Sequence, residues 1–148
     1  MEFRRVLFRS QEARPLDFGH WSAHKLEQIT RYRLRHGEAV SIGVALDTLY
    51  SHLKFGLDRQ DALMAVQALV DLQLPIYDQA LESQVVFEGL EEFRQHLGGR
   101  LTLTMLKSVG QILTIHEIDR ETMEQAIQWL RSIHEERLAS VSTASATD

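Results

Sequence analysis

The chain has 148 residues, enough for one domain with a hydrophobic core, and its apolar content of 44% is ordinary for a globular protein. Its formal net charge of −5 argues against nucleic acid as a partner, and the lack of cysteine excludes disulfides and a thiolate nucleophile. No run of about 18 apolar residues occurs, so the sequence predicts no membrane partner, and the lack of cysteine fits a cytoplasmic protein.

The first eleven residues differ in character from the rest of the chain. Arginines alternate there with short apolar runs, and the segment looks like a translated sequencing adapter joined to a truncated gene. We therefore expect residues 1–11 to be a foreign or disordered arm and the natural protein to be longer. Pro15 then begins a connector in which Asp17 can accept a backbone hydrogen bond at a helix start.

Apolar residues at helical spacing predict five helices. They run from Trp21 to Leu34, His36 to Lys54, Asp58 to Leu72, Val85 to Leu97 and Asp119 to Leu138. Gly43 lies within the second helix, where glycine costs about 1 kcal/mol against alanine, so we expect another backbone to approach it closely. Lys25 and Glu27 are most simply read as part of a solvated face, whereas Met64 and Leu72 fall on the predicted core face of the third helix.

A small hairpin interrupts the helical pattern. Leu101 to Leu106 and Gln111 to Ile115 alternate apolar and polar residues around a turn at Lys107 to Gly110. The sequence therefore predicts a mainly α domain over residues 12–138 with one β-hairpin. The small polar residues 139–148 are expected to form a disordered tail.

Three of the seven histidines fall within one short stretch. His20 and His24 are four residues apart and share a helix face, and His36 opens the next helix. If the two helices meet near their ends, His20 and His36 could bind one Zn²⁺ through bonds of about 2.0–2.1 Å, which requires their rings to come within about 5 Å of each other. Spacing alone leaves open that these histidines are incidental. Glu38 either favours the helix dipole or orients a zinc-bound histidine.

The residues around these histidines resemble a known family. Phe18-Gly19-His20, then His24 and Leu26-Glu27, then His36-Gly37-Glu38-Ala39-Val40-x-Ile42-Gly43 resemble the carboxy-terminal domain of 3-dehydroquinate synthase and its sugar-phosphate cyclase relatives. Weaker matches such as Gly98-Gly99 occur further along in the expected order, so the resemblance extends from about Ala13 to Leu138.

The resemblance implies an activity and its cofactors. Family members bind Zn²⁺ (or Co²⁺) and NAD, eliminate phosphate from a sugar phosphate and close a carbocycle by an intramolecular aldol addition. It implies that His20 and His36 are metal ligands and that His24 is a catalytic residue in proton transfer. The remaining ligand, a glutamate, and most NAD contacts belong to an amino-terminal domain that this sequence lacks, so we expect the chain to be inactive alone. Family members are often homodimers.

Two departures from the family pattern concern the substrate. Asp17 stands where asparagine is usual, and Arg94 stands in a stretch where the family has a substrate-contacting lysine. Both are candidate substrate-binding residues, because a guanidinium grips a carboxylate or phosphate with two bonds where lysine acts as a point charge. His96 is a further candidate. These departures favour, as an alternative, a relative that cyclises a heptulose phosphate.

Two further alternatives belong to other classes. One is a non-enzymatic helical interaction domain whose histidines carry no metal. The other is a complete helical metalloenzyme, which needs a carboxylate from this chain near His20 and His36, and Glu38 is the candidate that the sequence offers.

Overall fold

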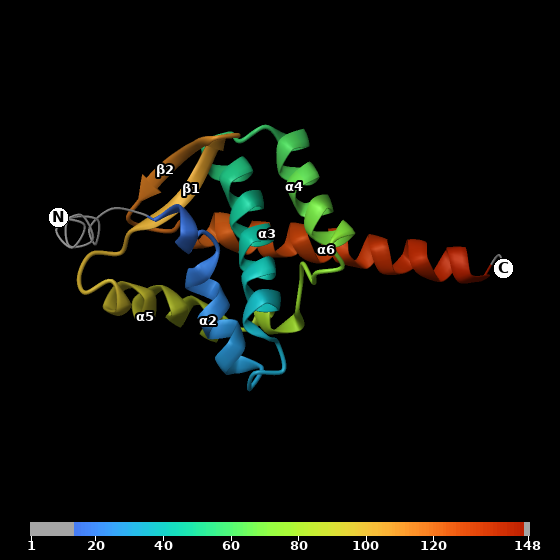
Figure 1. Cartoon of the computed structure of the whole chain (residues 1–148), viewed down its shortest axis with the longest axis horizontal. Helices are drawn as coiled ribbons and strands as arrows, with labels where there is room; N and C mark the ends of the chain where they lie inside the picture. Colours follow the sequence, from blue (N-terminus) through green and yellow to red (C-terminus); the bar gives the residue numbers. More distant parts are fainter. Residues whose placement is uncertain (1–13, 147–148) are drawn as a thin grey trace.

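The computed structural model describes residues 14–146 as a helical domain built around one central helix (Figure 1). This helix, α3 (His36–Phe55), contacts α2 (His20–Ile29), α4 (Arg59–Asp71), α6 (Arg120–Ala146) and the hairpin strand β1 (Leu103–Ser108). The helix α5 (Glu88–His96) packs on α2, and α6 runs behind α3 and projects beyond the body of the domain. None of the described helices combines the length and apolar character that a membrane crossing requires.

In the described part of the chain, three short 3-10 helices occur in the connecting segments. They are η1 (Pro15–Asp17), η2 (Gln79–Glu82) and η3 (Gln84–Phe87). The predicted helix from Val85 to Leu97 is therefore divided, since its first turn is the 3-10 helix η3 and the remainder is α5. Asp58 caps α4 as expected, because its Oδ1 accepts a hydrogen bond of 3.1 Å from the backbone N–H of Asp61.

The hairpin is antiparallel, and its first strand begins two residues later than predicted. β1 pairs with β2 (Gln111–Ile115) from Leu103 opposite Ile115 to Leu106 opposite Ile112, with an irregularity before Ser108. A lone hairpin is marginally stable, and here β1 is fixed to α3, because the backbone N–H of Leu106 donates to Oγ of Ser51 at 3.0 Å. The mainly α fold with one small hairpin is confirmed.

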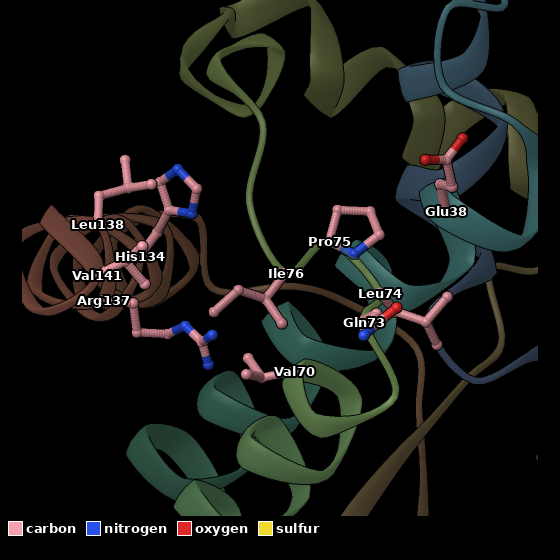
Figure 2. Close-up of a pocket in the computed structure, with 10 residues that line it drawn as sticks. All are labelled: Glu38, Val70, Gln73, Leu74, Pro75, Ile76, His134, Arg137, Leu138 and Val141. Atoms are coloured by element: carbon pink, nitrogen blue, oxygen red, sulfur yellow. The ribbon is translucent and has the colours of Figure 1, made fainter. Parts of the chain in front are cut away.

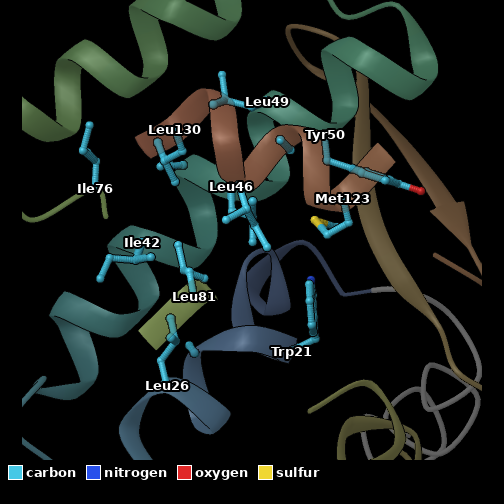
Figure 3. Packing of buried hydrophobic residues seen from close by; sticks show 14 of the residues in the cluster. Trp21, Leu26, Ile42, Leu46, Leu49, Tyr50, Ile76, Leu81, Met123 and Leu130 are labelled. Carbon is cyan, nitrogen blue, oxygen red and sulfur yellow. The ribbon is translucent and has the colours of Figure 1, made fainter. Parts of the chain in front are cut away.

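The hydrophobic core lies where α2, α3 and α6 meet (Figure 3). Its largest fully buried members in that region include Trp21 and Leu26 from α2, Leu46, Leu49 and Tyr50 from α3, and Met123 and Leu130 from α6. Met64 and Leu72 were wrongly predicted to face the core, since each is 69% exposed. Only one side of α4 packs on α3, so an apolar residue on its outer side stays in solvent.

The chain ends differ from the sequence prediction in one respect. Residues 139–146 continue α6, which corrects the expectation of a disordered tail from residue 139. The predicted foreign arm at residues 1–11 lies outside the described residues, as do residues 147–148.

A histidine cluster at the α2–α3 corner

The turn between α2 and α3 brings the histidines together. α2 ends at Ile29 rather than at Leu34, because Arg31 and Tyr32 adopt left-handed backbone angles (φ of 53° and 62°). The N–H of Tyr32 donates back to the carbonyl of Glu27 at 2.7 Å, which closes the helix end. The chain therefore reverses at once, and the start of α3 returns beside the outer face of α2.

A backbone contact fixes the other end of α2. Gly19 (φ of 80°) precedes α2, and a Cβ added to Gly43 in α3 would lie 1.9 Å from its carbonyl oxygen. The expectation that another backbone approaches Gly43 is thus confirmed. This contact sets the position of His20, the first residue of α2, against α3.

A buried carboxylate makes a second contact between the start of α2 and α3. Oδ1 of Asp47 in α3 accepts a hydrogen bond of 3.0 Å from the indole Nε1–H of Trp21. Burial raises the pKa of Asp47 to about 7, while its hydrogen bonds with Trp21 and the backbone of Gly19 act in the opposite direction. Asp47 therefore fixes the start of α2, and within residues 14–146 it forms no ion pair.

His20, His24 and His36 form a triangle of rings. Their centroids are 5.7 Å apart for His20 and His36, 5.8 Å for His24 and His36, and 6.4 Å for His20 and His24. Two imidazoles that bind one tetrahedral ion have centroids about 5 Å apart, since each metal–nitrogen bond is about 2 Å. The predicted pair, His20 and His36, lies on one side of the fold, and its centroid distance of 5.7 Å is slightly larger than this separation.

Each of these histidines presents its Nδ1 to an oxygen atom. Nδ1 of His20 lies 3.2 Å from the carbonyl oxygen of Phe18, and Nδ1 of His36 lies 2.7 Å from Oε1 of Glu27. Nδ1 of His24 is 3.6 Å from Oε2 of Glu27, too far for a hydrogen bond. In His20 and His36, an acceptor at Nδ1 places the proton there and leaves the lone pair on Nε2, the arrangement found in metal-bound histidines.

Glu27 is the residue that the sequence prediction missed. It was assigned to a solvated face, but its side chain is only 12% exposed and lies between His24 and His36. The sequence could have indicated this position, because residues 20, 24 and 27 fall at i, i+4 and i+7 and therefore share one helix face. Lys25 was misassigned in the same way, since it is buried and pairs with Glu92 of α5 at 2.6 Å.

The histidines alone do not complete a metal site. Within residues 14–146, no group of three or more histidine, aspartate or glutamate side chains is arranged to hold a metal ion. Glu27 reaches the cluster from the Nδ1 side, where it accepts a hydrogen bond and is not placed as a ligand. A zinc ion held by His20 and His36 would therefore need a further ligand from elsewhere.

Glu38 does not orient the cluster. Its Oε1 accepts a hydrogen bond of 3.0 Å from the backbone N–H of Arg35, which stabilises the start of α3. Its side chain also lines a separate cavity of about 490 Å³ between the 70–76 segment and α6, where Arg137 points toward Val70 and Ile76 (Figure 2). Of its two expected roles, Glu38 takes the one at the helix start.

A smaller cavity adjoins His24. It has a volume of about 220 Å³, lies between α2 and α5, and combines aromatic walls with polar groups. Its lining residues are Trp21, His24, Gln28, Gly89, Glu92, Phe93 and His96. The exposed imidazole of His24 thus borders a space able to hold part of a small molecule.

The two candidate substrate residues lie at different places. Asp17 ends η1, just before the Phe18 carbonyl that faces His20. Arg94, near the end of α5, binds Glu91 with two nitrogens (2.9 and 2.5 Å) and the carbonyl of Gly99 with a third (2.8 Å). Neither residue lines the cavity beside His24, whereas His96 does.

Fold and site together define a mainly helical domain with three histidine rings clustered at the corner between α2 and α3. The family model described as "3-dehydroquinate synthase C-terminal" matches residues 7–95, more than half of the chain. The chain belongs to this 3-dehydroquinate synthase C-terminal family.

Curated relatives carry two kinds of name. The chain is 36% identical over 123 residues to a 2-epi-valiolone synthase of Stigmatella aurantiaca, covering 82% of this chain and 30% of that protein. It is 31% identical over 104 residues to a 3-dehydroquinate synthase of Leuconostoc citreum, covering 69% of this chain and 28% of that protein. The chain thus spans about 30% of the length of these relatives.

A solved structure shares the fold. ValA, a 2-epi-5-epi-valiolone synthase from Streptomyces hygroscopicus subsp. jinggangensis with NAD⁺ and Zn²⁺ bound, superposes with a TM-score of 0.77 at 22% identity. The match covers 88% of this chain and 36% of ValA. At this identity the comparison establishes the fold of the domain.

Proposed function

We propose that this chain is the metal- and substrate-binding carboxy-terminal part of a 3-dehydroquinate synthase-like sugar-phosphate cyclase. The observation that carries the proposal is the approach of His20 and His36, from two different helices, to a centroid distance of 5.7 Å. The division into an arm at residues 1–11 and a domain from residue 12, with the NAD domain missing, is part of this proposal. So are a cytoplasmic location and a homodimer of the full-length protein.

The ligand set supports an incomplete rather than a complete metal site. His20 and His36 would hold Zn²⁺ or Co²⁺ through their Nε2 atoms, and the remaining ligand would be the glutamate that the family resemblance assigns to the amino-terminal domain. Bound metal would supply Lewis acidity toward a substrate hydroxyl, and NAD would supply the hydride acceptor. The chain alone should therefore bind metal weakly and lack cyclase activity.

Other residues of this chain would transfer a proton and bind the substrate. His24 borders the cavity between α2 and α5, and its loose contact with Glu27 leaves its ring free to take up and release a proton at Nε2. Asp17 and Arg94 would bind substrate. Because Arg94 is engaged by Glu91 and Gly99, its contact with a substrate phosphate or carboxylate would exchange these bonds for new ones.

A cyclase for a heptulose phosphate is the second candidate. Asp17 and Arg94 replace the residues usual in 3-dehydroquinate synthases, and one curated relative, 36% identical, is named a 2-epi-valiolone synthase. Recovering the sequence upstream of Glu12 and assaying the full-length protein with several sugar phosphates, by phosphate release and product identification, separates the two candidates.

Metal binding by the 148-residue chain tests the proposal directly. We expect Zn²⁺ or Co²⁺ to bind with a dissociation constant in about the micromolar range, as measured by titration calorimetry and Co²⁺ absorption. His20→Ala and His36→Ala should each abolish binding, whereas His134→Ala in α6 should leave it unchanged. Equal binding by all four proteins, or none by the unaltered chain, would favour the non-enzymatic interaction domain.

A further inference from the structure

Glu27 is a carboxylate that the fold buries beside imidazoles. It lies in the last turns of α2, its side chain is 12% exposed, and its ion-pair partners within residues 14–146 are His24 and His36. A buried carboxylate is costly unless hydrogen-bond donors satisfy it, and most such groups pair with arginine or lysine. The partners of Glu27 are instead two rings of the proposed active site.

The bond to His36 is short and directional. Oε1 of Glu27 lies 2.7 Å from Nδ1 of His36, although the His36 side chain is 59% exposed. An exposed imidazole would otherwise rotate and exchange its proton between the two nitrogens. Acceptance by a fixed carboxylate keeps the proton on Nδ1 and directs the lone pair to Nε2.

The two contacts of Glu27 are unequal. Oε2 of the same carboxylate lies 3.6 Å from Nδ1 of His24, which is beyond a hydrogen bond. Oε1 therefore fixes His36, the proposed metal ligand, through a hydrogen bond. Oε2 lies near His24, the proposed proton-transfer residue, without a hydrogen bond that would fix its ring. An amide in place of the carboxylate could not serve both rings, because only one of its two polar atoms is an acceptor.

We propose that Glu27 is a positioning residue that fixes the tautomer and ring orientation of His36 for metal binding and restrains His24 beside it. The inference deepens the proposed function and rests on it for the role of His36. Glu27 touches neither metal nor substrate in this arrangement. It acts through His36, so its removal should weaken metal binding without removing a ligand.

Two measurements on the 148-residue chain test this role. Long-range ¹H–¹⁵N correlation spectra of the metal-free protein, recorded at about pH 8.5 where imidazole is neutral, report which nitrogen of His36 carries the proton. We expect Nδ1–H in the unaltered chain and a shift toward Nε2–H in Glu27→Ala. Co²⁺ titration should show affinity about 10–100-fold weaker in Glu27→Ala and an intermediate loss in Glu27→Gln.

Glu38→Gln is the matched control. It makes the same chemical change two residues from His36, at a carboxylate that bonds backbone instead of a ring, and should alter neither the His36 tautomer nor the Co²⁺ affinity. An unchanged His36 tautomer in Glu27→Ala, or equal Co²⁺ losses in Glu27→Gln and Glu38→Gln, would overturn the role of Glu27. If the unaltered chain binds no Co²⁺, the proposed function fails, and the tautomer measurement still decides whether Glu27 orients His36.

Discussion

The carbonyl of Gly19 lies against Gly43 so closely that a Cβ at position 43 would approach its oxygen to 1.9 Å. This contact joins the start of α2 to the middle of α3. It leaves no space for any side chain, and it determines where His20 begins its helix relative to His36.

Gly43→Ala should therefore separate the two helices. We expect the free energy of unfolding in urea to fall by about 2 kcal/mol or more, since the methyl group meets backbone rather than a flexible side chain. Co²⁺ affinity should fall as well, because His20 moves with α2. Gly37→Ala in the same helix is the control, because nothing lies within 4 Å of its added Cβ, and it should keep or slightly raise stability. Equal stabilities of the two variants would contradict the contact.

Asp47 predicts an unusual dependence of stability on pH. Burial raises its pKa from 3.8 to about 7 in the folded state, so the folded protein binds a proton more tightly than the unfolded chain does. Stability from this group is fully present below about pH 4 and is lost as the pH rises toward 7. Asp47→Asn removes the ionisable group and keeps an acceptor for Trp21. It should flatten this slope and stabilise the protein at pH 8 by up to about 4 kcal/mol.

Thermal or urea unfolding measured from pH 4 to pH 8 checks this expectation. Asp58→Asn is the control, because Asp58 is an exposed helix cap at which asparagine serves equally well. Parallel curves for Asp47→Asn and the unaltered chain would show that Asp47 ionises normally.

The ion pair between Lys25 and Glu92 should contribute more to stability than the ion pair between Glu91 and Arg94 on α5. Lys25 is buried between α2 and α5, and its Nζ lies 2.6 Å from Glu92 and 3.4 Å from Glu88. Glu92→Gln leaves this ammonium with two weaker partners, Glu88 and Gln28, each at 3.4 Å. We expect the free energy of unfolding to fall by about 1–2 kcal/mol. Circular dichroism during urea titration measures this change.

Glu91→Gln provides the comparison. Glu91 pairs with Arg94 on the exposed side of α5, three residues away, and such pairs contribute roughly 0.5 kcal/mol or less. Losses of equal size in the two variants would mean that Lys25 does not depend on Glu92.

The helical pattern of the sequence was a reliable guide where one face of a segment is apolar and the other is not. The bounds of α3 agree with prediction almost to the residue, and Asp58 caps α4 as its chemistry requires. Burial was misjudged for Met64 and for Lys25, because residue type gives only the tendency to be buried, and the packing of α4 and α5 decides which side is covered.

The sequence by itself determined the mainly α fold, the hairpin, the family and the two histidine motifs. These depend on short-range spacing, which a linear chain displays directly. Only the tertiary structure decided that α2 stops at Ile29, that the left-handed turn after it returns His36 to α2, and that Glu27 lies between His24 and His36. The physical reason is that the groups beside a carboxylate decide whether it forms a hydrogen bond or stays in solvent. For Glu27 these groups are brought together by the chain reversal after α2, which depends on contacts between residues far apart in sequence.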